Sequence, residues 1–228
     1  MSEPRGVIFD MDGVLVNSYR AHLRSWQDTA ERFGVHMSDE DFARSFGRTS
    51  REIIRSLWPG RFDDGHVVSF DTTKEERYRE ILEADFPEMP GASELIAQLH
   101  ETGFRLAIGS SGPPANVELV KRKLSQGKLI EATVNGTEVK HGKPEPDVFL
   151  IAARKIQVEP KNCAVIEDAP VGIEAAKRAG MVAIGLTGTA PRAALRSLRA
   201  DLVVDSLHEL IAAQVVRLIC GVGVRPTH

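Results

Sequence analysis

The stretch that decides the fold is Phe9-Asp10-Met11-Asp12-Gly13-Val14, which overlaps the end of the apolar run 6–9. Residues two apart on a strand face the same side, so the carboxylates of Asp10 and Asp12 can converge where the strand enters a loop. Two like charges that close repel each other unless a cation lies between them or they do different acid–base work. A turn with solvated aspartates is the plainer interpretation, and the rest of the chain decides between the two.

Three further polar clusters follow later in the chain. They are Ser110-Ser111, Lys143-Pro144 and Glu167-Asp168. Each follows an apolar or turn-rich stretch at the expected end of a strand, and the carboxyl ends of parallel strands are where open α/β sheets bind ligands. The order of the four clusters therefore favours one shared site.

Short apolar runs alternate with helical stretches from residue 105 onward. The runs are 105–108, 132–134, 164–166, 182–186 and 202–204. This rhythm predicts an α/β fold, with a Rossmann-like parallel sheet and helices on both of its faces.

Helices are predicted between these strands. The expected ranges are 94–101, 147–155 and 171–179. Gly103 and Gly180 stand where a glycine C-cap belongs. Apolar residues from Leu207 to Ile219 recur at helical spacing and predict a last helix that packs on the core.

The pattern changes between the first strand and Pro90-Gly91, where helices are expected in place of strands. The expected ranges are 18–33, 39–46, 50–57 and 67–84, and Ser38 to Asp41 resembles a capping box with aspartate as its last residue. We therefore predict a core domain made of 1–16 and 87–228 and an inserted small helical cap domain, 17–86. A lid above the strand ends can exclude water and select the substrate.

Composition excludes several classes of protein. The 228 residues are 42% hydrophobic and 27% charged with a net charge of −3, which is ordinary for a globular protein and leaves no basic footprint for nucleic acid or an anionic membrane. Cys163 and Cys220 lie in no CxxC or His-Cys cluster, which argues against disulfides and structural zinc. No signal peptide or membrane-spanning helix is expected at the N-terminus, so a cytoplasmic location is predicted.

The four clusters together resemble the haloacid dehalogenase superfamily, in the branch of phosphatases and phosphomutases with a small helical cap near β-phosphoglucomutase. The motifs are Asp10-Met11-Asp12-Gly13, Ser110, Gly142-Lys143-Pro144 and Glu167-Asp168. The resemblance extends from the N-terminus to about Leu210. It implies a phosphoryl-transfer enzyme that uses Mg²⁺ and forms an aspartyl-phosphate on Asp10.

The resemblance also implies roles for the site residues. Asp10 is the expected nucleophile, and Asp12 the general acid and later the general base. The substrate phosphate is expected to bind Ser110, Ser111 and Lys143. The expected Mg²⁺ site comprises Asp10, Asp168 and Asp12 through its backbone carbonyl, with Glu167 acting through water or orienting its neighbours.

Elementary electrostatics supports this assignment. A phosphoester dianion repels a carboxylate nucleophile, so cations must bring the two together, and Lys143 and Mg²⁺ would be those cations. Each residue taken alone has a plainer interpretation: a surface lysine, turn serines, or an acidic pair at the start of a helix.

Candidates in the predicted cap depend on the resemblance alone. It places Ser18 and His22 at the first cap helix and Lys74 four residues before Tyr78. Arg48 is a further candidate for substrate contact, as is Arg51. Two positions depart from the family pattern: Asn17 stands where aspartate is frequent, and Pro113 stands near a basic residue of the mutase.

The predicted function is a Mg²⁺-dependent phosphatase of a small phosphorylated metabolite, sugar phosphates included. A sugar phosphomutase is the nearest alternative, and a phosphorylatable regulatory module is a third, although a seventy-residue cap suits a substrate better. A dehalogenase does not need Asp12, and a phosphonate hydrolase dispenses with a carboxylate there. The substrate, the oligomeric state, for which a monomer is plausible, and the role of the tail after Cys220 stay open.

Overall fold

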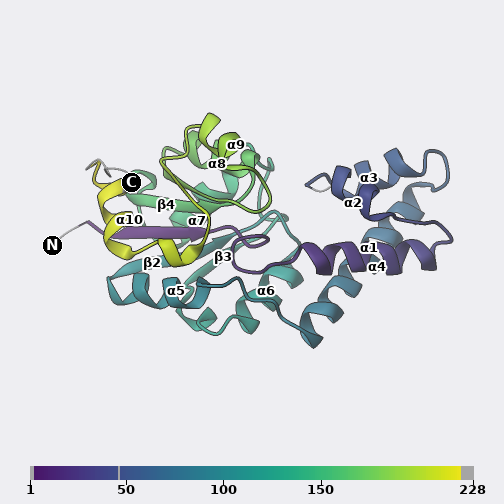
Figure 1. Ribbon diagram of the computed structural model, residues 1–228, viewed down its shortest axis with the longest axis horizontal. Helices are drawn as coiled ribbons and strands as arrows, with labels where there is room; N and C mark the ends of the chain where they lie inside the picture. Colours follow the sequence, from purple (N-terminus) through teal and green to yellow (C-terminus); the bar gives the residue numbers. More distant parts are fainter. Residues whose placement is uncertain (1–2, 46, 222–228) are drawn as a thin grey trace. The chain divides into compact units, whose positions relative to one another are not determined.

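The computed structural model describes residues 3–45 and 47–221, and the chain divides into two compact units (Figure 1). The sheet unit comprises Met1–Asn17 and Glu88–His228, and the helical unit comprises Ser18–Pro87. That the helical unit serves as a substrate cap stays a prediction. Most of the tail after Cys220 lies outside the described residues.

The sheet unit is built on six parallel strands in the order β3-β2-β1-β4-β5-β6. They are β1 (Arg5–Phe9), β2 (Phe104–Gly109), β3 (Ala132–Val134), β4 (Cys163–Glu167), β5 (Val182–Leu186) and β6 (Leu202–Val204). The inner strands are buried on both faces, which explains why they read as continuous apolar runs. The predicted α/β fold is confirmed.

The strand order reverses beside β1. The chain runs outward from β1 through β2 to β3 and then returns to place β4 on the other side of β1. Phe9 pairs with Ile108 of β2 and with Ile166 of β4. The residues that follow these three strands therefore lie next to one another at the same edge of the sheet. Such a switch point is where α/β sheets leave a crevice for a ligand.

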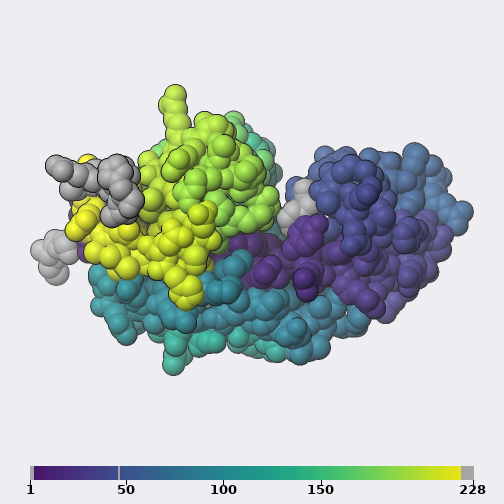
Figure 2. All heavy atoms as spheres, in the orientation of Figure 1, coloured from purple at the N-terminus to yellow at the C-terminus, as the bar shows by residue number. Residues whose placement is uncertain are grey.

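Helices cover both faces of the sheet (Figure 1). On one face lie α7 (Asp147–Lys155), α8 (Pro170–Arg178) and α9 (Arg192–Ser197), over a core that includes Ile8, Phe149 and Val165. On the other lie α5 (Ala92–Glu101), α6 (Pro114–Lys123) and α10 (Ala212–Ile219). Figure 2 shows atoms of α10, in yellow, on the surface of the sheet unit. No helix of the described residues has the length and apolar character needed to cross a membrane.

Two helix ends agree with the glycine signals, but the predicted last helix differs from the structure. Gly103 and Gly180 adopt positive φ after α5 and α8, as expected of C-caps. The apolar stripe from Leu207 does not form one helix: a short 3-10 turn, η3 (Leu207–Glu209), is followed by an extended Ile211 before α10 begins. The stripe was misleading because Gln214 accepts a bond from the Ile211 N–H and so favours a new helix start there.

The described residues of the helical unit form four helices: α1 (Tyr19–Arg32), α2 (Asp39–Ser45), α3 (Ser50–Leu57) and α4 (Asp64–Ala84). α4 begins three residues before the expected start because Asp63 caps it, accepting a 2.8 Å bond from the His66 N–H. At α2 only half of the expected box forms: Ser38 accepts from the Asp41 N–H, and its hydroxyl donates to the Asp41 carboxylate. The full capping box lies at Thr49 and Glu52.

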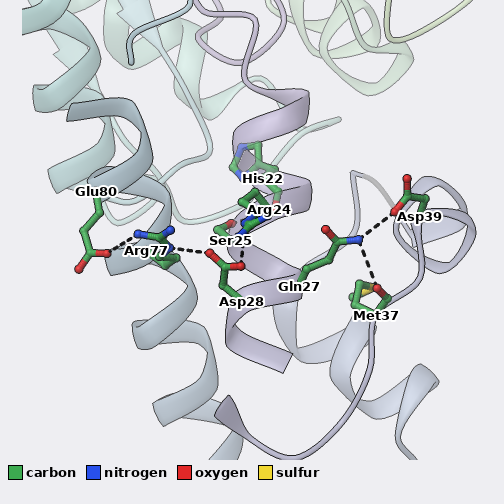
Figure 3. Close-up of polar contacts among 9 residues, drawn as sticks. All are labelled: His22, Arg24, Ser25, Gln27, Asp28, Met37, Asp39, Arg77 and Glu80. Atoms are coloured by element: carbon green, nitrogen blue, oxygen red, sulfur yellow. Dashed lines mark hydrogen bonds and ion pairs between the residues drawn. The ribbon is translucent and has the colours of Figure 1, made fainter. Parts of the chain in front are cut away.

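Polar contacts fasten the first helix of this unit to its neighbours (Figure 3). Arg77 of α4 donates to Asp28 of α1 at 2.8 Å and to Glu80 of its own helix at 2.9 Å. Gln27 of α1 donates to Asp39 at the start of α2 at 2.8 Å. The half-exposed pairs orient the helices, while packing supplies most of the stability.

An aromatic cluster forms the core of the helical unit. Phe70 is fully buried, and its ring lies 4.8 to 5.9 Å from four other rings, those of Trp26, Phe33, Trp58 and Phe62. Ring pairs at these distances add stability beyond the burial of their area. Phe70 is therefore the residue on which the packing of this unit depends most.

We predict that Phe70→Ala destabilises the helical unit by about 3–5 kcal/mol, because it leaves a cavity among four rings. Both tryptophans of the chain, Trp26 and Trp58, lie in this unit, so the urea midpoint of their fluorescence reports on it directly. The control is Phe70→Leu, which retains most of the volume and is expected to lose less. An unchanged midpoint for Phe70→Ala would contradict this account of the core.

Candidate active site

Asp10 stands at the carboxyl end of β1, and a tight loop follows it. Its backbone N–H donates to the Ile166 carbonyl at 3.0 Å, so the carboxylate is fixed beside the end of β4. The loop turns at Gly13, whose φ of +78° suits glycine and whose N–H donates to the Val16 carbonyl at 2.9 Å. Only 8% of Asp10 is exposed.

Lys143 lies between two buried carboxylates. Its Nζ donates to Asp10 Oδ1 and to Glu167 Oε1, each at 2.6 Å, and it lies 4.8 Å from the centre of the Phe149 ring. The loop that carries Lys143 is fastened to α7, since the His141 N–H donates to the Asp147 carboxylate at 3.1 Å. Three strand-end and loop segments far apart in the sequence therefore meet at one ammonium group.

Glu167 is the most deeply placed of the acidic residues. One of its oxygens accepts from Lys143, and the other accepts from the Ala169 N–H at 2.7 Å. A Cβ on Gly172, in the first turn of α8, would lie 1.7 Å from Oε1 of Glu167, so only glycine leaves room for this side chain. Glu167 therefore accepts a hydrogen bond from Lys143 and occupies the space that Gly172 leaves at the start of α8.

Asp168 and Asp12 complete the acidic group. Carboxylate oxygens of Asp10, Glu167 and Asp168 all lie within 4.8 Å of one another, and the three residues are buried. Asp12 is half-buried, and it lies near enough that its charge helps raise the pKa of Asp10. The structure therefore gathers Asp10, Asp168, Glu167 and Lys143, with Asp12 beside them.

Negative charge is in excess at this site. Burial, followed by the Glu167 charge, raises the pKa of Asp10 to about 7 even though Lys143 opposes the shift. Burial, then the charges of Glu167 and Asp10, also raise the pKa of Asp168 well above its ordinary value. Burial disfavours the charge of Lys143, but Asp10 and Glu167 more than offset this and hold its pKa above the usual range.

A divalent cation fits this set of residues. Three ionised carboxylates against one ammonium give this buried cluster an excess of two negative charges, which a divalent ion would neutralise. The donors are all oxygen atoms, which hard cations such as Mg²⁺ and Ca²⁺ prefer. The acidic cluster is thus suited to a hard divalent metal ion.

Ser110 begins the loop after β2, on the other side of β1. It is buried, its N–H donates to the Val134 carbonyl, and its Oγ accepts from the Gly112 N–H at 3.0 Å. Accepting that bond leaves the hydroxyl hydrogen to donate to a bound anion. The neighbouring Ser111 is exposed. Both serines therefore belong to a loop that opens at the same edge of the sheet as Asp10.

In the helical unit, His22 and Lys74 lie together. The His22 ring stacks on Tyr78 with centroids 4.1 Å apart, and its Nδ1 is 3.2 Å from Lys74 Nζ. Lys74 is buried and also donates to Glu75 at 2.7 Å. The part of His22 and Lys74 in substrate binding stays a prediction.

The two arginine candidates differ. Arg51 donates to Asp64 at 3.2 Å and so helps to fasten α3 to the start of α4. Arg48 is exposed just before α3, where its charge lowers the pKa of Glu52 after the bonds from Thr49. Arg48 therefore keeps its place as a candidate for substrate contact, while Arg51 has a structural partner.

Sequence reasoning missed three residues at this site. Phe149 lies beside the Lys143 ammonium, Gly172 makes room for Glu167, and the Thr189 hydroxyl lies near Gly13 on the side of the Asp168 carboxylate. Gly172 had a signal, because a glycine in the first turn of a predicted helix costs stability and needs a reason. Phe149 and Thr189 had none, since their roles depend on contacts across the fold.

Several known proteins resemble this chain in sequence. A sequence profile of haloacid dehalogenase-like hydrolases matches residues 4–180. A validoxylamine A 7'-phosphate phosphatase from Streptomyces hygroscopicus subsp. limoneus is 34% identical over 212 residues, which cover 89% of this chain and 94% of that protein. A β-phosphoglucomutase from Bacillus subtilis (strain 168) is 31% identical over 213 residues, which cover 90% and 91%.

Solved structures agree with the sequence comparison. The crystal structure of a HAD hydrolase, family IA, variant 3, from Entamoeba histolytica HM-1:IMSS superposes with a TM-score of 0.85 at 26% identity, and the match covers 95% of this chain and 99% of that one. The chain belongs to the haloacid dehalogenase-like hydrolase family. The resemblance stated from the four motifs is confirmed, and so is the prediction of an enzyme of this class.

We predict that Asp10→Asn makes the metal-free protein more stable at neutral pH. An aspartate whose pKa rises from about 3.9 in the unfolded chain to about 7 in the fold binds more protons when folded. Its contribution to stability is therefore complete below the unfolded value and is lost as the pH rises through 7. An asparagine does not titrate, so the melting temperature of the Asp10→Asn protein in EDTA should exceed that of the wild type above pH 7.

Melting temperatures measured with Mg²⁺ present test whether Asp10 belongs to a metal site. A cation at 100 times its Kd adds about 2.7 kcal/mol to the stability of the protein that binds it. Mg²⁺ is therefore expected to raise the melting temperature of the wild type and to raise that of Asp10→Asn much less. Equal responses of the two proteins would contradict a metal site that includes Asp10.

Proposed function

We propose that this protein is a Mg²⁺-dependent phosphatase of a small phosphorylated metabolite, a sugar or sugar-like phosphate, with an aspartyl-phosphate on Asp10 as intermediate. The observation that carries the proposal is the Asp10 carboxylate, held 2.6 Å from the Lys143 ammonium among buried acids at the switch point of the sheet. Relatives named as phosphatases support the reaction class, among them hexitol phosphatase A of Escherichia coli at 32% identity.

In the first step an oxygen of Asp10 attacks phosphorus, and the bond from phosphorus to the ester oxygen breaks. Lys143 lies against Asp10 and reduces the repulsion between the carboxylate and the phosphoester dianion. Asp12 gives its proton to the departing oxygen, which leaves as a neutral alcohol. Ser110, at the loop after β2, donates its hydroxyl to a phosphoryl oxygen, and Ser111 contributes to the same loop.

In the second step water opens the aspartyl-phosphate. Asp12, now a carboxylate, takes a proton from the water as its oxygen attacks phosphorus. The bond between phosphorus and Asp10 breaks, which releases inorganic phosphate and restores the nucleophile. The half-buried position of Asp12 suits a group that must meet both an alcohol and water.

Mg²⁺ would be held by Asp10, Asp168 and the backbone carbonyl of Asp12, and when bound it supplies positive charge to the phosphoryl oxygens. Glu167 is assigned a supporting part, since both of its oxygens already accept hydrogen bonds from Lys143 and Ala169. The excess negative charge of the acidic cluster supports this assignment.

A phosphomutase uses the same intermediate but must hold a second phosphate. One observation favours hydrolysis: Pro113 stands before α6, near the position where the mutase has a basic residue, and it offers no cation. The 31% identity to a β-phosphoglucomutase keeps the mutase as the second candidate. Arg48 or Arg51 would have to supply the missing cation in that case.

We predict that Asp10→Asn abolishes turnover, because the amide keeps the shape of the side chain but is not a nucleophile. Asp12→Asn keeps the nucleophile and should lose about 10²- to 10⁴-fold in rate. With p-nitrophenyl phosphate, whose leaving group needs no proton, Asp12→Asn is expected to accumulate the aspartyl-phosphate, detected by mass spectrometry. Full phosphate release by folded Asp10→Asn would refute the mechanism.

The reaction class is tested with β-glucose 1-phosphate, a trace of glucose 1,6-bisphosphate and Mg²⁺, following free phosphate and glucose 6-phosphate together. We expect multiple-turnover phosphate release from at least one member of a panel of phosphorylated sugars and no efficient isomerisation. EDTA is expected to stop the reaction, and excess Mg²⁺ to restore it. Rapid isomerisation with little phosphate would select the mutase, whereas a single turnover would indicate a regulatory module.

A further inference from the structure

The loop after β3 lies directly against the loop that carries Ser110. We call these segments the β3 loop (135–138) and the serine loop (110–113). The Ser110 N–H donates to the Val134 carbonyl at 3.0 Å, at the end of β3. Further along, the Gly136 N–H donates to the Gly112 carbonyl at 2.8 Å. The two bonds continue the pairing of β2 with β3 beyond the ends of both strands, so the serine loop is held at two points.

Gly136 makes this close approach possible. A Cβ at this position would lie 2.3 Å from the Ser111 carbonyl oxygen and 3.1 Å from its carbonyl carbon. The φ of Gly136 lies outside the left-handed region, so the need for glycine comes from lack of space and not from φ. Backbone atoms cannot rotate away as the end of a long side chain can. Any side chain at this position must therefore push the two loops apart.

Gly112 connects this contact to the Ser110 hydroxyl. Its carbonyl accepts from Gly136, and its own N–H donates to Ser110 Oγ at 3.0 Å. A Cβ on Gly112 would lie 3.2 Å from that Oγ and 3.3 Å from Cε of Met11, in the loop after β1. Because Oγ accepts the bond from Gly112, its hydrogen is left to donate elsewhere. A shift of Gly112 therefore moves the donor that Ser110 offers to an anion.

Side-chain bonds hold the β3 loop in shape on both sides of Gly136. Asn135 Oδ1 accepts from the Thr137 N–H at 3.0 Å and from its hydroxyl at 2.7 Å. Asn135 Nδ2 donates to Glu138 at 2.8 Å, and Lys155 of α7 forms an ion pair with Glu138. These bonds resist movement of the β3 loop, so a side chain at Gly136 passes part of the displacement to the serine loop.

We propose that Gly136 is a positioning residue for phosphate binding, because its lack of a side chain lets the β3 loop hold the Ser110 hydroxyl toward a phosphoryl oxygen. The inference rests on the proposed function, since it concerns the phosphate of that reaction. The acidic cluster follows β1 and β4 and is fastened by Lys143. Substitution of Gly136 is therefore expected to weaken the binding of phosphate and to leave the binding of Mg²⁺ unchanged.

The test measures the Kd of inorganic phosphate in excess Mg²⁺, by calorimetry on the full chain. A hydrogen bond to a charged group contributes enough to change an affinity about 10- to 100-fold, and we expect Gly136→Ala to raise the Kd of phosphate by that factor. Asn135→Ala, which loosens the β3 loop without a clash, should raise it by a smaller factor. Gly65→Ala is the matched control, since a Cβ on this exposed residue of α4 would lie an ordinary 3.4 Å from Asp63 Oδ1.

A double-mutant cycle with Ser110→Ala separates positioning from a general structural effect. If Gly136 acts through Ser110, then Gly136→Ala should add little to the loss that Ser110→Ala causes. Wild-type phosphate affinity in Gly136→Ala, an equal loss of Mg²⁺ affinity, or additive losses in the double variant would overturn the proposal.

The same calorimetry distinguishes this inference from the proposed reaction, because it reads binding without turnover. A protein that hydrolyses no phosphoester but binds phosphate, and binds it more weakly in Gly136→Ala, would support the positioning role and refute the reaction. Turnover by the wild type with equal phosphate affinities in the two proteins would do the reverse. Absence of phosphate binding by the wild type would overturn both.

Discussion

The ammonium group of Lys143 between the buried carboxylates of Asp10 and Glu167 is the interaction on which the site depends. Charges this deeply buried are tolerated only when paired, and the pairing here requires segments from three distant parts of the sequence. β1 and β4 must be neighbours, and the loop before α7 must reach the gap between them. The adjacency of β1 and β4 therefore brings the Asp10 and Glu167 carboxylates to the same ammonium group.

Much of the fold could be predicted because its strands are buried on both faces and read as apolar runs. The glycine C-caps at Gly103 and Gly180 fixed two helix ends, and the four polar clusters located the residues around Lys143. The break in the predicted last helix could not be inferred from spacing, since the bond from the Ile211 N–H to Gln214 favours a new helix start there and apolar periodicity does not record hydrogen bonds.

Roles that depend on contact across the fold were the hardest to infer from sequence. The Glu167-Asp168 pair is readable as a helix start with favourable acids, and that interpretation is physically sound. What the local sequence does not contain is the ammonium of Lys143, the space left by Gly172, or the hydroxyl of Thr189. Neighbouring acids thus have different surroundings: Glu167 binds protein groups with both oxygens, and Asp168 faces the cluster.

The ends of the inserted segment have a consequence for how such a protein can change. Val16 and Glu88 form an antiparallel bridge, and the Met89 N–H donates to the Leu15 carbonyl at 3.0 Å, so the sheet unit closes upon itself where the helical unit departs and returns. The pairing of the strands therefore does not depend on the length or the sequence of Ser18–Pro87. A change within the inserted helical unit can therefore leave the hydrogen bonds that join its two ends within the sheet unit as they are.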